Sequence, residues 1–346
     1  MVSYSVHHQH RHHDDHPAAR GPHHAWFVAV AAVVVAFAVA VVVAVGGGAV
    51  YVGSVASTFD SHVSHLQRAF PAEAVRPAPA STGAMNILLL GSDSRGAPTE
   101  VGQTGLSNQR ADTMMLVHID ADRRNVYLIS IMRDLWVPIP GNGTAKINAA
   151  LAWGGTPLVI QTVEQLLDAR IDHVAIIDFA GLTNMTNALG GVDVDSPVAF
   201  STTTPHYRFV KGMNHLDGAQ ALAFARERYA FPTSDYQRVA DQQALMRGFA
   251  AKLMSLDVLA DPGKLTSFAA AAGSSVKVDQ GFGMQEMLQL AASMRLSGAS
   301  SIHSFTLPTA GTGTSADGQS IVNVDQDAVA RLRTALADDT LSTFGG

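Results

Sequence analysis

Arginine and aspartate occur together at one end of each of three apolar runs that have the length of β-strands. The runs lie within 86–95, 109–119 and 125–134, and their pairs are Asp93 with Arg95, Arg110 with Asp112, and Arg133 with Asp134. Carboxylate oxygens are ligands that Mg²⁺ prefers, and guanidinium groups fork onto phosphate oxygens. If the three strand ends meet, they suit a divalent metal together with a polyanion such as pyrophosphate.

A predicted hairpin brings these pairs together. Only residues 120–124 join the second and third runs, which is short enough for an antiparallel turn. A hairpin sets the start of one strand beside the end of the other, so Arg110, Asp112 and Arg133 are expected at one sheet edge. Asp93 leaves the carboxyl end of the first run, where open α/β sheets bind ligands. Taken singly, each residue is more often a solvated loop residue or half of a surface ion pair. The argument for a site therefore rests on the repetition of the same residue types at three strand ends.

A second group of polar residues follows a predicted helix that begins at Gly218. Arg226 and Arg228 are two positions apart and would point to opposite sides of a helix, so we interpret Arg226-Glu-Arg228 as a helix exit. A further helix is expected from Asp235 to about Ser255. One face of it carries Asp235, Arg238 and Gln242. The alternative is an ordinary amphipathic surface helix with an aspartate cap.

Composition narrows the class of protein. Hydrophobic residues make up 47% of the 346 residues and charged residues 15%, which permits a large buried core. The formal net charge of −6 argues against a nucleic-acid-binding protein. The chain has no cysteine, so disulfides and thiolate chemistry are excluded.

The N-terminal region predicts a membrane anchor. Residues 1–24 hold eight histidines and no apolar periodicity, which is typical of a disordered polar tail. Residues 26–45 are uncharged and apolar, and about 20 such residues cross a bilayer. A cleaved signal peptide is the alternative, but its apolar region normally has only about 7–15 residues. Arginines precede the span and the next one is Arg68, so a cytoplasmic N-terminus and an extracytoplasmic domain are expected in the cell membrane.

The expected domain organisation has four parts. They are a His-rich tail at 1–24, a transmembrane helix at 25–52, a juxtamembrane stalk at 53–84 and a globular domain at 85–340. Residues 71–83 are rich in proline and alanine and predict a spacer within the stalk.

Alternating strands and helices in the domain predict an α/β fold with a mixed central sheet sandwiched between helices. The expected elements after the hairpin are helices near 156–167, 179–189, 283–296 and 325–336, strands at 174–178 and 304–307, and a flexible segment at 309–315.

Several short motifs carry a family resemblance over roughly residues 85–255. They are Gly-Ser-Asp-Ser-Arg at Gly91, Arg-Ala-Asp-Thr-Met-Met at Arg110, Ser-Ile-Met-Arg-Asp at Ser130, Lys-Ile-Asn-Ala-Ala at Lys146, Ile-Asp-His at Ile171, Gly-Gly-Val at Gly190 and Ala-Arg-Glu-Arg at Ala225. In this order the set resembles the LytR-CpsA-Psr family. The resemblance implies a membrane-anchored phosphotransferase that moves a glycopolymer from a polyprenyl-pyrophosphate carrier in the membrane lipid onto peptidoglycan. The net charge, not the resemblance, is the reason to expect no nucleic-acid partner.

The resemblance also implies roles for individual residues. Asp93 and Asp112 match the metal ligands, for Mg²⁺ or alternatively Mn²⁺. The positions that match or fit substrate binding are Arg95, Arg110, Arg133, Arg226, Arg228, Arg238 and Gln242. Arg110, Arg133 and Asp235 are the expected catalytic residues. Either Asp235 or Asp134 could accept the proton of the incoming hydroxyl, and the sequence leaves that choice open.

The chain departs from the family pattern at two positions. Met132 stands where the family often has proline, and Asp241 stands where it usually has arginine. An acid one turn from Arg238 would either hold that guanidinium or weaken the anion site. Asp241 therefore keeps open a polyprenyl-phosphate-binding or scaffolding protein with little turnover. A membrane-bound transcriptional attenuator is a further alternative, but only the short tail is expected on the cytoplasmic side.

Overall fold

The computed structural model describes residues 49–92, 111–203, 205–227, 255–296 and 301–344, together with 241, 244–245, 248–249 and 251–252. The predicted tail and the span at 26–45 lie outside these residues. No helix within the described ranges is long and apolar enough to cross a membrane.

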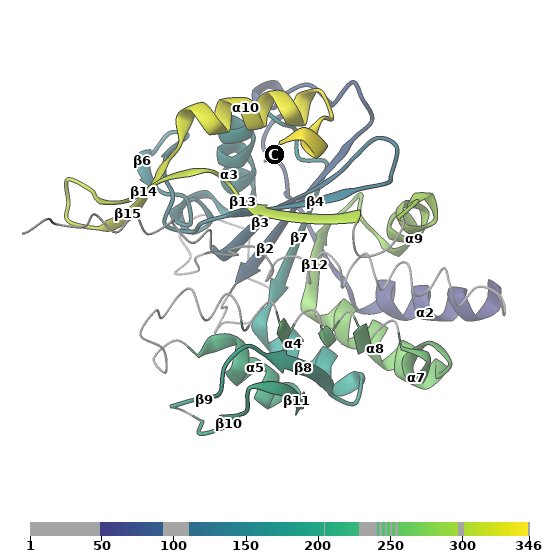
Figure 1. Cartoon of the computed structure of the whole chain (residues 1–346). Helices are drawn as coiled ribbons and strands as arrows, with labels where there is room; N and C mark the ends of the chain where they lie inside the picture. Colours follow the sequence, from purple (N-terminus) through teal and green to yellow (C-terminus); the bar gives the residue numbers. More distant parts are fainter. Residues whose placement is uncertain are drawn as a thin grey trace, which may run out of the picture.

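A seven-stranded mixed sheet forms the centre of the domain, as the sequence predicted (Figure 1). Its strands, in spatial order, are β1 (Ser64–Leu66), β12 (Val276–Asp279), β7 (His173–Asp178), β2 (Met85–Ser92), β3 (Ala111–Ile119), β4 (Val126–Ile131) and β13 (Ile302–Thr306). Strands β2 and β7 are parallel, as are β4 and β13, whereas β3 runs antiparallel to both of its neighbours. The predicted β3–β4 hairpin is confirmed by the pairing of Met114 with Ile131 and of Ile119 with Val126.

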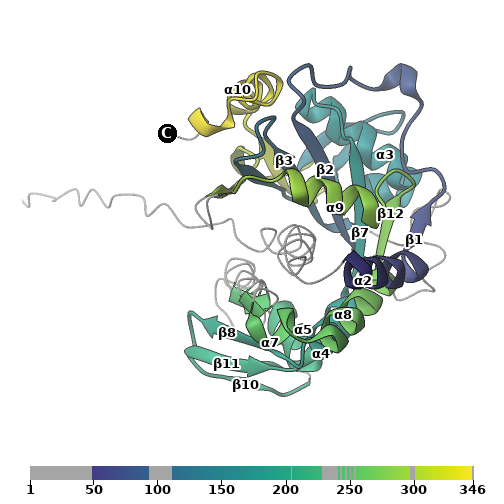
Figure 2. The same cartoon turned by 90° about the vertical axis from the view of Figure 1, so that its right-hand side faces the viewer.

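Helices cover both faces of this sheet, because its central strands are apolar on both sides. All six residues of β4 are buried. One face packs on α3 (Ala149–Leu167) and α10 (Gln326–Ala337), and we call it the α3 face. The other, the α8 face, is covered by α2 (Ala49–His62), α4 (Phe179–Ala188), α5 (Gly218–Arg226), α8 (Pro262–Ser275) and α9 (Met284–Ser293). Figures 1 and 2 show α3 and α10 on one side of the sheet and α4, α5 and α8 on the other.

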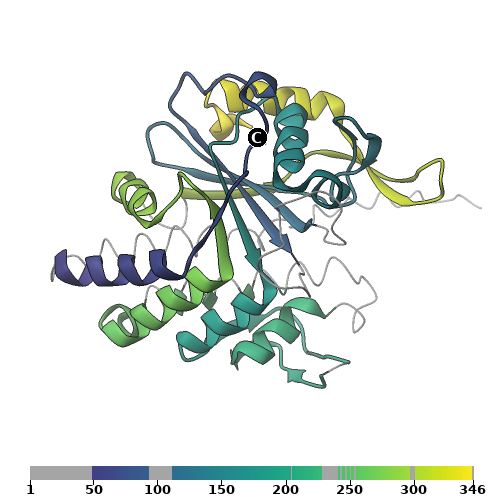
Figure 3. The ribbon, with the colours of Figure 1, turned by 180° about the vertical axis from the view of Figure 1, so that it is seen from behind.

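Smaller elements surround these layers. Four two-stranded sheets are formed by β5 (Trp136–Ile139) with β6 (Gly143–Lys146), β8 (Val192–Ser196) with β11 (Gly212–Leu216), β9 (Phe200–Ser201) with β10 (Arg208–Phe209), and β14 (Thr309–Thr314) with β15 (Ser320–Val324). The short helices are α7 (Leu256–Leu259), η2 (Glu73–Val75) and η4 (Leu341–Thr343). Residues 309–315 were expected to be flexible, but most of them form β14, because β15 supplies antiparallel partners. This β14–β15 hairpin projects from the body of the domain (Figures 1 and 3).

Residues 53–84 differ from the stalk that the sequence suggested, because they pack into the domain. Val55 and Phe59 of α2 are 1% and 3% exposed and belong to the core of the α8 face. Helix α8 passes so close that a Cβ atom added at Gly273 would lie 2.7 Å from the carbonyl oxygen of Phe59. Strand β1 then joins the edge of the central sheet beside β12.

The proline-rich spacer is also tied to the domain. The guanidinium of Arg76 donates to one carboxylate oxygen of Glu164 in α3, from Nε at 3.0 Å and from Nη2 at 2.7 Å. Glu164 is fully buried, and the same oxygen accepts a hydrogen bond from the backbone N–H of Ile171 at 3.0 Å. Removing either partner of a buried ion pair would leave an uncompensated charge, so this contact fixes the segment before β2.

Other predicted elements agree with the structure to within a few residues. Helix α3 breaks at Gly154–Gly155, and its second half begins at Thr156–Pro157 as expected. The boundaries of β7, α4, α9, β13 and α10 follow the predicted strands and helices closely. Helix α10 is capped by Asp325, whose carboxylate accepts from the backbone N–H of Ala328 at 3.0 Å.

Candidate active site

The carboxyl ends of four strands meet at one edge of the sheet. Parallel pairing sets Ser92 of β2 beside Asp178 of β7, and Ser130 of β4 beside Thr306 of β13. Strand β3 runs the other way, so its first residues start at this same edge, which we call the carboxyl edge. Open α/β sheets bind ligands at such an edge.

The register brings to this edge the residues that come just before the two predicted metal ligands. Ser92, the residue before Asp93, pairs with Ala111, the residue before Asp112, next to an irregularity in the β2–β3 ladder. Asp93 itself lies outside the described residues, and only the backbone of Asp112 is described. Two carboxylates on adjacent strand ends would supply the oxygen ligands that Mg²⁺ prefers. Among the described side chains, no group of three or more His, Cys, Asp and Glu residues gathers to hold a metal.

Arg133 lies two positions after the last residue of β4, at the carboxyl edge. Its Nε lies 3.6 Å from Oδ2 of Asp134, and Nζ of Lys146 lies 3.0 Å from the other carboxylate oxygen. All three side chains are partly exposed, between 22% and 34%. Asp134 thus holds two cations side by side, which favours a positioning role for this carboxylate.

Sequence reasoning did not assign a role to Lys146. The β5–β6 hairpin returns the chain to the end of β4, because Trp136 pairs with Lys146. Backbone hydrogen bonds hold the return, from the N–H of Ile147 to Leu135 at 2.8 Å and from the N–H of Asn148 to Arg133 at 3.2 Å. The Gly-rich turn before Lys146-Ile-Asn was the sequence signal that could have predicted that Lys146 returns to Asp134.

The predicted helix exit is confirmed for its first two residues. Helix α5 ends at Arg226, and Glu227 has extended backbone angles of φ −65° and ψ 133°. A capping box between Asp217 and Gln220 starts this helix. Glu227 is 6% exposed and accepts a hydrogen bond from the backbone N–H of Thr203 at 3.0 Å.

Most other predicted site residues lie outside the described part of the chain. They are Asp93, Arg95, Arg110, Arg228, Asp235, Arg238 and Gln242. Asp112 and Arg226 are described by their backbones only. The roles that the sequence suggested for these nine residues therefore stay predictions.

Asp241, the departure from the family pattern, is fully buried. Ala244 and Leu245, three and four positions later, are helical like Asp241 and belong to the core of the α8 face. Positions i, i+3 and i+4 share one side of a helix, so Asp241 faces inward with them.

Two buried hydroxyl groups have no hydrogen-bond partner among the residues that the structure describes. One is Oγ of Ser130, in β4 at the carboxyl edge, and the other is Oγ1 of Thr156, at the break in α3. The two residues are 6% and 0% exposed. Leaving such a group unsatisfied costs about 1–3 kcal/mol, so each position needs a physical explanation.

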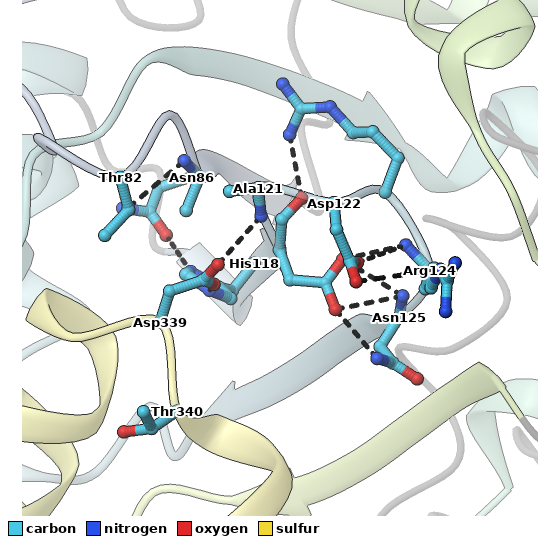
Figure 4. Close-up of polar contacts among 12 residues, drawn as sticks. Thr82, Asn86, His118, Ala121, Asp122, Arg124, Asn125, Asp339 and Thr340 are labelled. Carbon is cyan, nitrogen blue, oxygen red and sulfur yellow. Dashed lines mark hydrogen bonds and ion pairs between the residues drawn. The ribbon is translucent and has the colours of Figure 1, made fainter.

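A polar network at the opposite end of the sheet has a structural role (Figure 4). His118 is buried, and its ring nitrogens lie 2.9 Å from Oδ1 of Asn86 and 3.1 Å from Oδ1 of Asp339. Burial lowers the pKa of the His118 imidazole, and the hydrogen bond with Asp339 opposes that shift. The other oxygen of Asp339 accepts from the backbone N–H of Ala121 at 2.9 Å. These contacts tie the chain after α10 to the hairpin.

The fold is that of an α/β protein with a mixed central sheet. At the carboxyl edge of this sheet Arg133 and Lys146 flank Asp134, and these two cations form a candidate anion-binding site. The chain belongs to the LytR_cpsA_psr family, which residues 49–338 match. The resemblance that the motifs suggested is therefore confirmed.

Individual relatives agree with this family. A protein of Enterococcus faecalis (strain ATCC 700802 / V583), named polyisoprenyl-teichoic acid–peptidoglycan teichoic acid transferase TagU, is 33% identical over 72% of this chain and 78% of its own length. The crystal structure of B. subtilis TagV is 27% identical, with a TM-score of 0.59 over 75% of this chain and 98% of that one. An Enterococcus faecalis structure described as a transcriptional regulator is also 27% identical, with a TM-score of 0.56 over 75% of this chain and 89% of that one.

Proposed function

We propose that this chain is a phosphotransferase that moves a cell-wall glycopolymer from a polyprenyl-pyrophosphate carrier onto peptidoglycan. The observation that carries this proposal is membership of the family over residues 49–338, together with 33% identity to a relative named as a teichoic acid transferase. The cations at the carboxyl edge support it, because a pyrophosphate donor is a dense anion.

The reaction needs charge neutralisation more than covalent help from the protein. An acceptor hydroxyl oxygen forms a bond to the phosphorus that carries the glycan, and the bond from this phosphorus to the bridging oxygen breaks. The electron pair stays on the bridging oxygen, which leaves as part of the prenyl phosphate. Arg133 and Lys146 would bind the pyrophosphate oxygens, joined by Arg95, Arg110, Arg226, Arg228, Arg238 and Gln242.

The proton of the acceptor hydroxyl requires a base. Asp134 is already engaged on both oxygens, by Arg133 at 3.6 Å and by Lys146 at 3.0 Å. We therefore assign Asp134 to positioning of these cations and Asp235 to proton abstraction.

We also propose that Asp93 and Asp112 hold Mg²⁺, with Mn²⁺ as a substitute. Support comes from the pairing of Ser92 with Ala111, the residues that precede Asp93 and Asp112 in the chain. When bound, the ion would neutralise charge on the phosphate oxygens.

A single membrane anchor at 26–45 would hold the domain close to the membrane in which a lipid-linked donor is embedded. We propose a cytoplasmic N-terminus and an extracytoplasmic domain, with residues 85–340 as its catalytic part. Helix α2 begins at Ala49, shortly after the predicted span, so the anchor would lead directly into a helix of the domain.

Transfer by the purified full chain tests the proposal. The donor is a short glycan on a prenyl pyrophosphate, the acceptor is peptidoglycan, and the assay contains either Mg²⁺ or a chelator. Glycan should become bound to peptidoglycan in amounts equal to the prenyl phosphate released. Donor binding without release would support the scaffolding alternative, and DNA binding without donor binding would support the attenuator.

A further inference from the structure

Ser130 is a polar residue in an otherwise apolar row. Along β4, Val126 and Leu128 belong to the core of the α8 face, and Ser130 continues this row because side chains alternate along a strand. Its carbonyl oxygen accepts a hydrogen bond from the backbone N–H of Leu307 at 2.8 Å. Its hydroxyl is buried and has no partner within the described ranges.

The place of this hydroxyl in the row is informative. Ser130 is the second-last residue of β4, and Arg133 lies beyond the strand in a turn that is closed by a hydrogen bond from the N–H of Leu135 to the carbonyl oxygen of Met132 at 3.0 Å. From the carboxyl edge inward along β4, the chain therefore presents first the guanidinium of Arg133, then the hydroxyl of Ser130, and then the apolar side chain of Leu128. A prenyl pyrophosphate has a matching order of terminal phosphate, lipid-linked phosphate and hydrocarbon.

We propose that the Ser130 hydroxyl donates a hydrogen bond to an oxygen of the phosphate that carries the prenyl chain. The inference rests on the proposed function, in which this phosphate is the leaving group. Its oxygens gain negative charge as the bond to the bridging oxygen breaks. A hydrogen-bond donor fixed in a buried position interacts more strongly with this developing charge than with the phosphate of the intact pyrophosphate. It therefore accelerates transfer.

The same hydroxyl would also bind the product. Prenyl monophosphate retains the phosphate oxygens that the Ser130 hydroxyl would contact. The affinity of the protein for prenyl monophosphate therefore measures this contact in the absence of any reaction. A hydroxyl that only holds an ordered water molecule would not discriminate between phosphate and other ligands.

The test compares Ser130→Ala with Thr156→Val. Thr156 is a matched control, because its buried hydroxyl also has no partner among the described residues, but it lies in α3 on the other face of the sheet. Neither substitution removes a hydrogen bond within the described part of the chain, so neither should lower the melting temperature. Ser130→Ala should reduce kcat/KM about 10-fold and weaken prenyl monophosphate binding by a similar factor. Thr156→Val should leave both values unchanged.

Equal affinity and equal kcat/KM for wild type and Ser130→Ala would overturn the inference alone. Equal losses in both variants would overturn it too, because a general effect on the fold would then explain them. A wild-type protein that neither binds prenyl monophosphate nor transfers glycan would overturn the proposed function and this inference together.

Discussion

At the scale of residues, the described part of the site is a shared ion pair. One carboxylate, Asp134, contacts both Arg133 and Lys146. Partly exposed pairs contribute at most about 1 kcal/mol to stability, so this arrangement adds little to the stability of the fold. Two predictions follow from the charges at this edge.

Lys146→Ala should raise the KM for the pyrophosphate donor about tenfold, because one ammonium leaves the anion site. Its melting temperature should change little, since the lost ion pair is partly exposed. Lys264→Ala is a matched control that removes an ammonium paired with Asp257 elsewhere in the domain. Steady-state kinetics over a range of donor concentrations measure the effect, and similar KM values for both variants would exclude Lys146 from the site.

Asp93→Ala and Asp112→Ala should each lower transfer by about two orders of magnitude, because phosphoryl transfer depends on metal charge. Each variant should also need more Mg²⁺ for half-maximal rate, and the double variant should be little worse than either single one. Asp122→Ala is the control, since its exposed carboxylate lies at the other end of the β3–β4 hairpin. Wild-type rates with an unchanged Mg²⁺ midpoint would show that Asp93 and Asp112 bind no catalytic metal.

At the scale of elements, α2 is a structural part of the domain. It packs on α8 through a close approach at Gly273 and on α9 through Asp60, whose carboxylate accepts from the backbone N–H of Met284 at 3.0 Å. Nothing in the local sequence of residues 49–62 specifies these partners, which lie more than 200 positions later.

Gly273→Ala should destabilise the domain by about 1–3 kcal/mol, because the new methyl group would lie 2.7 Å from the backbone oxygen of Phe59. Gly53→Ala makes the same change in α2 where nothing lies within 4 Å, so it should be neutral or gain up to about 1 kcal/mol. Urea denaturation of both variants measures the difference. Equal stabilities would mean that the two helices can separate without cost.

At the scale of the whole molecule, the described elements from α2 to the segment after α10 belong to one domain. Residues that the sequence assigned to a stalk contribute a helix, an edge strand and the buried Arg76–Glu164 pair. The proposed anchor would therefore lead directly into a helix of the domain.

A protein that starts at Met85 should consequently be much less stable than one that starts at Ala49. The shorter chain exposes the apolar surface that α2 and β1 cover and leaves Glu164 buried without its guanidinium. Thermal unfolding and aggregation of the two purified chains provide the measurement. A cooperative transition at the same temperature in both would restore the original boundary near residue 85.

Local sequence patterns were sufficient for the central part of the fold. Apolar runs predicted β2, β3, β4 and β7, and the short 120–124 connection predicted the hairpin that brings their ends to one edge. Such features depend on neighbouring residues, because side-chain periodicity and turn length are local properties. Tertiary structure alone decided that Arg76 meets Glu164 across 88 positions, that Lys146 meets Asp134 and that residues 309–314 pair with β15. It also decided that the Ser130 hydroxyl is buried with no hydrogen-bond partner among the described residues. These outcomes depend on which distant parts of the chain pack together in the folded domain. The periodicity of apolar residues in the sequence does not specify those contacts.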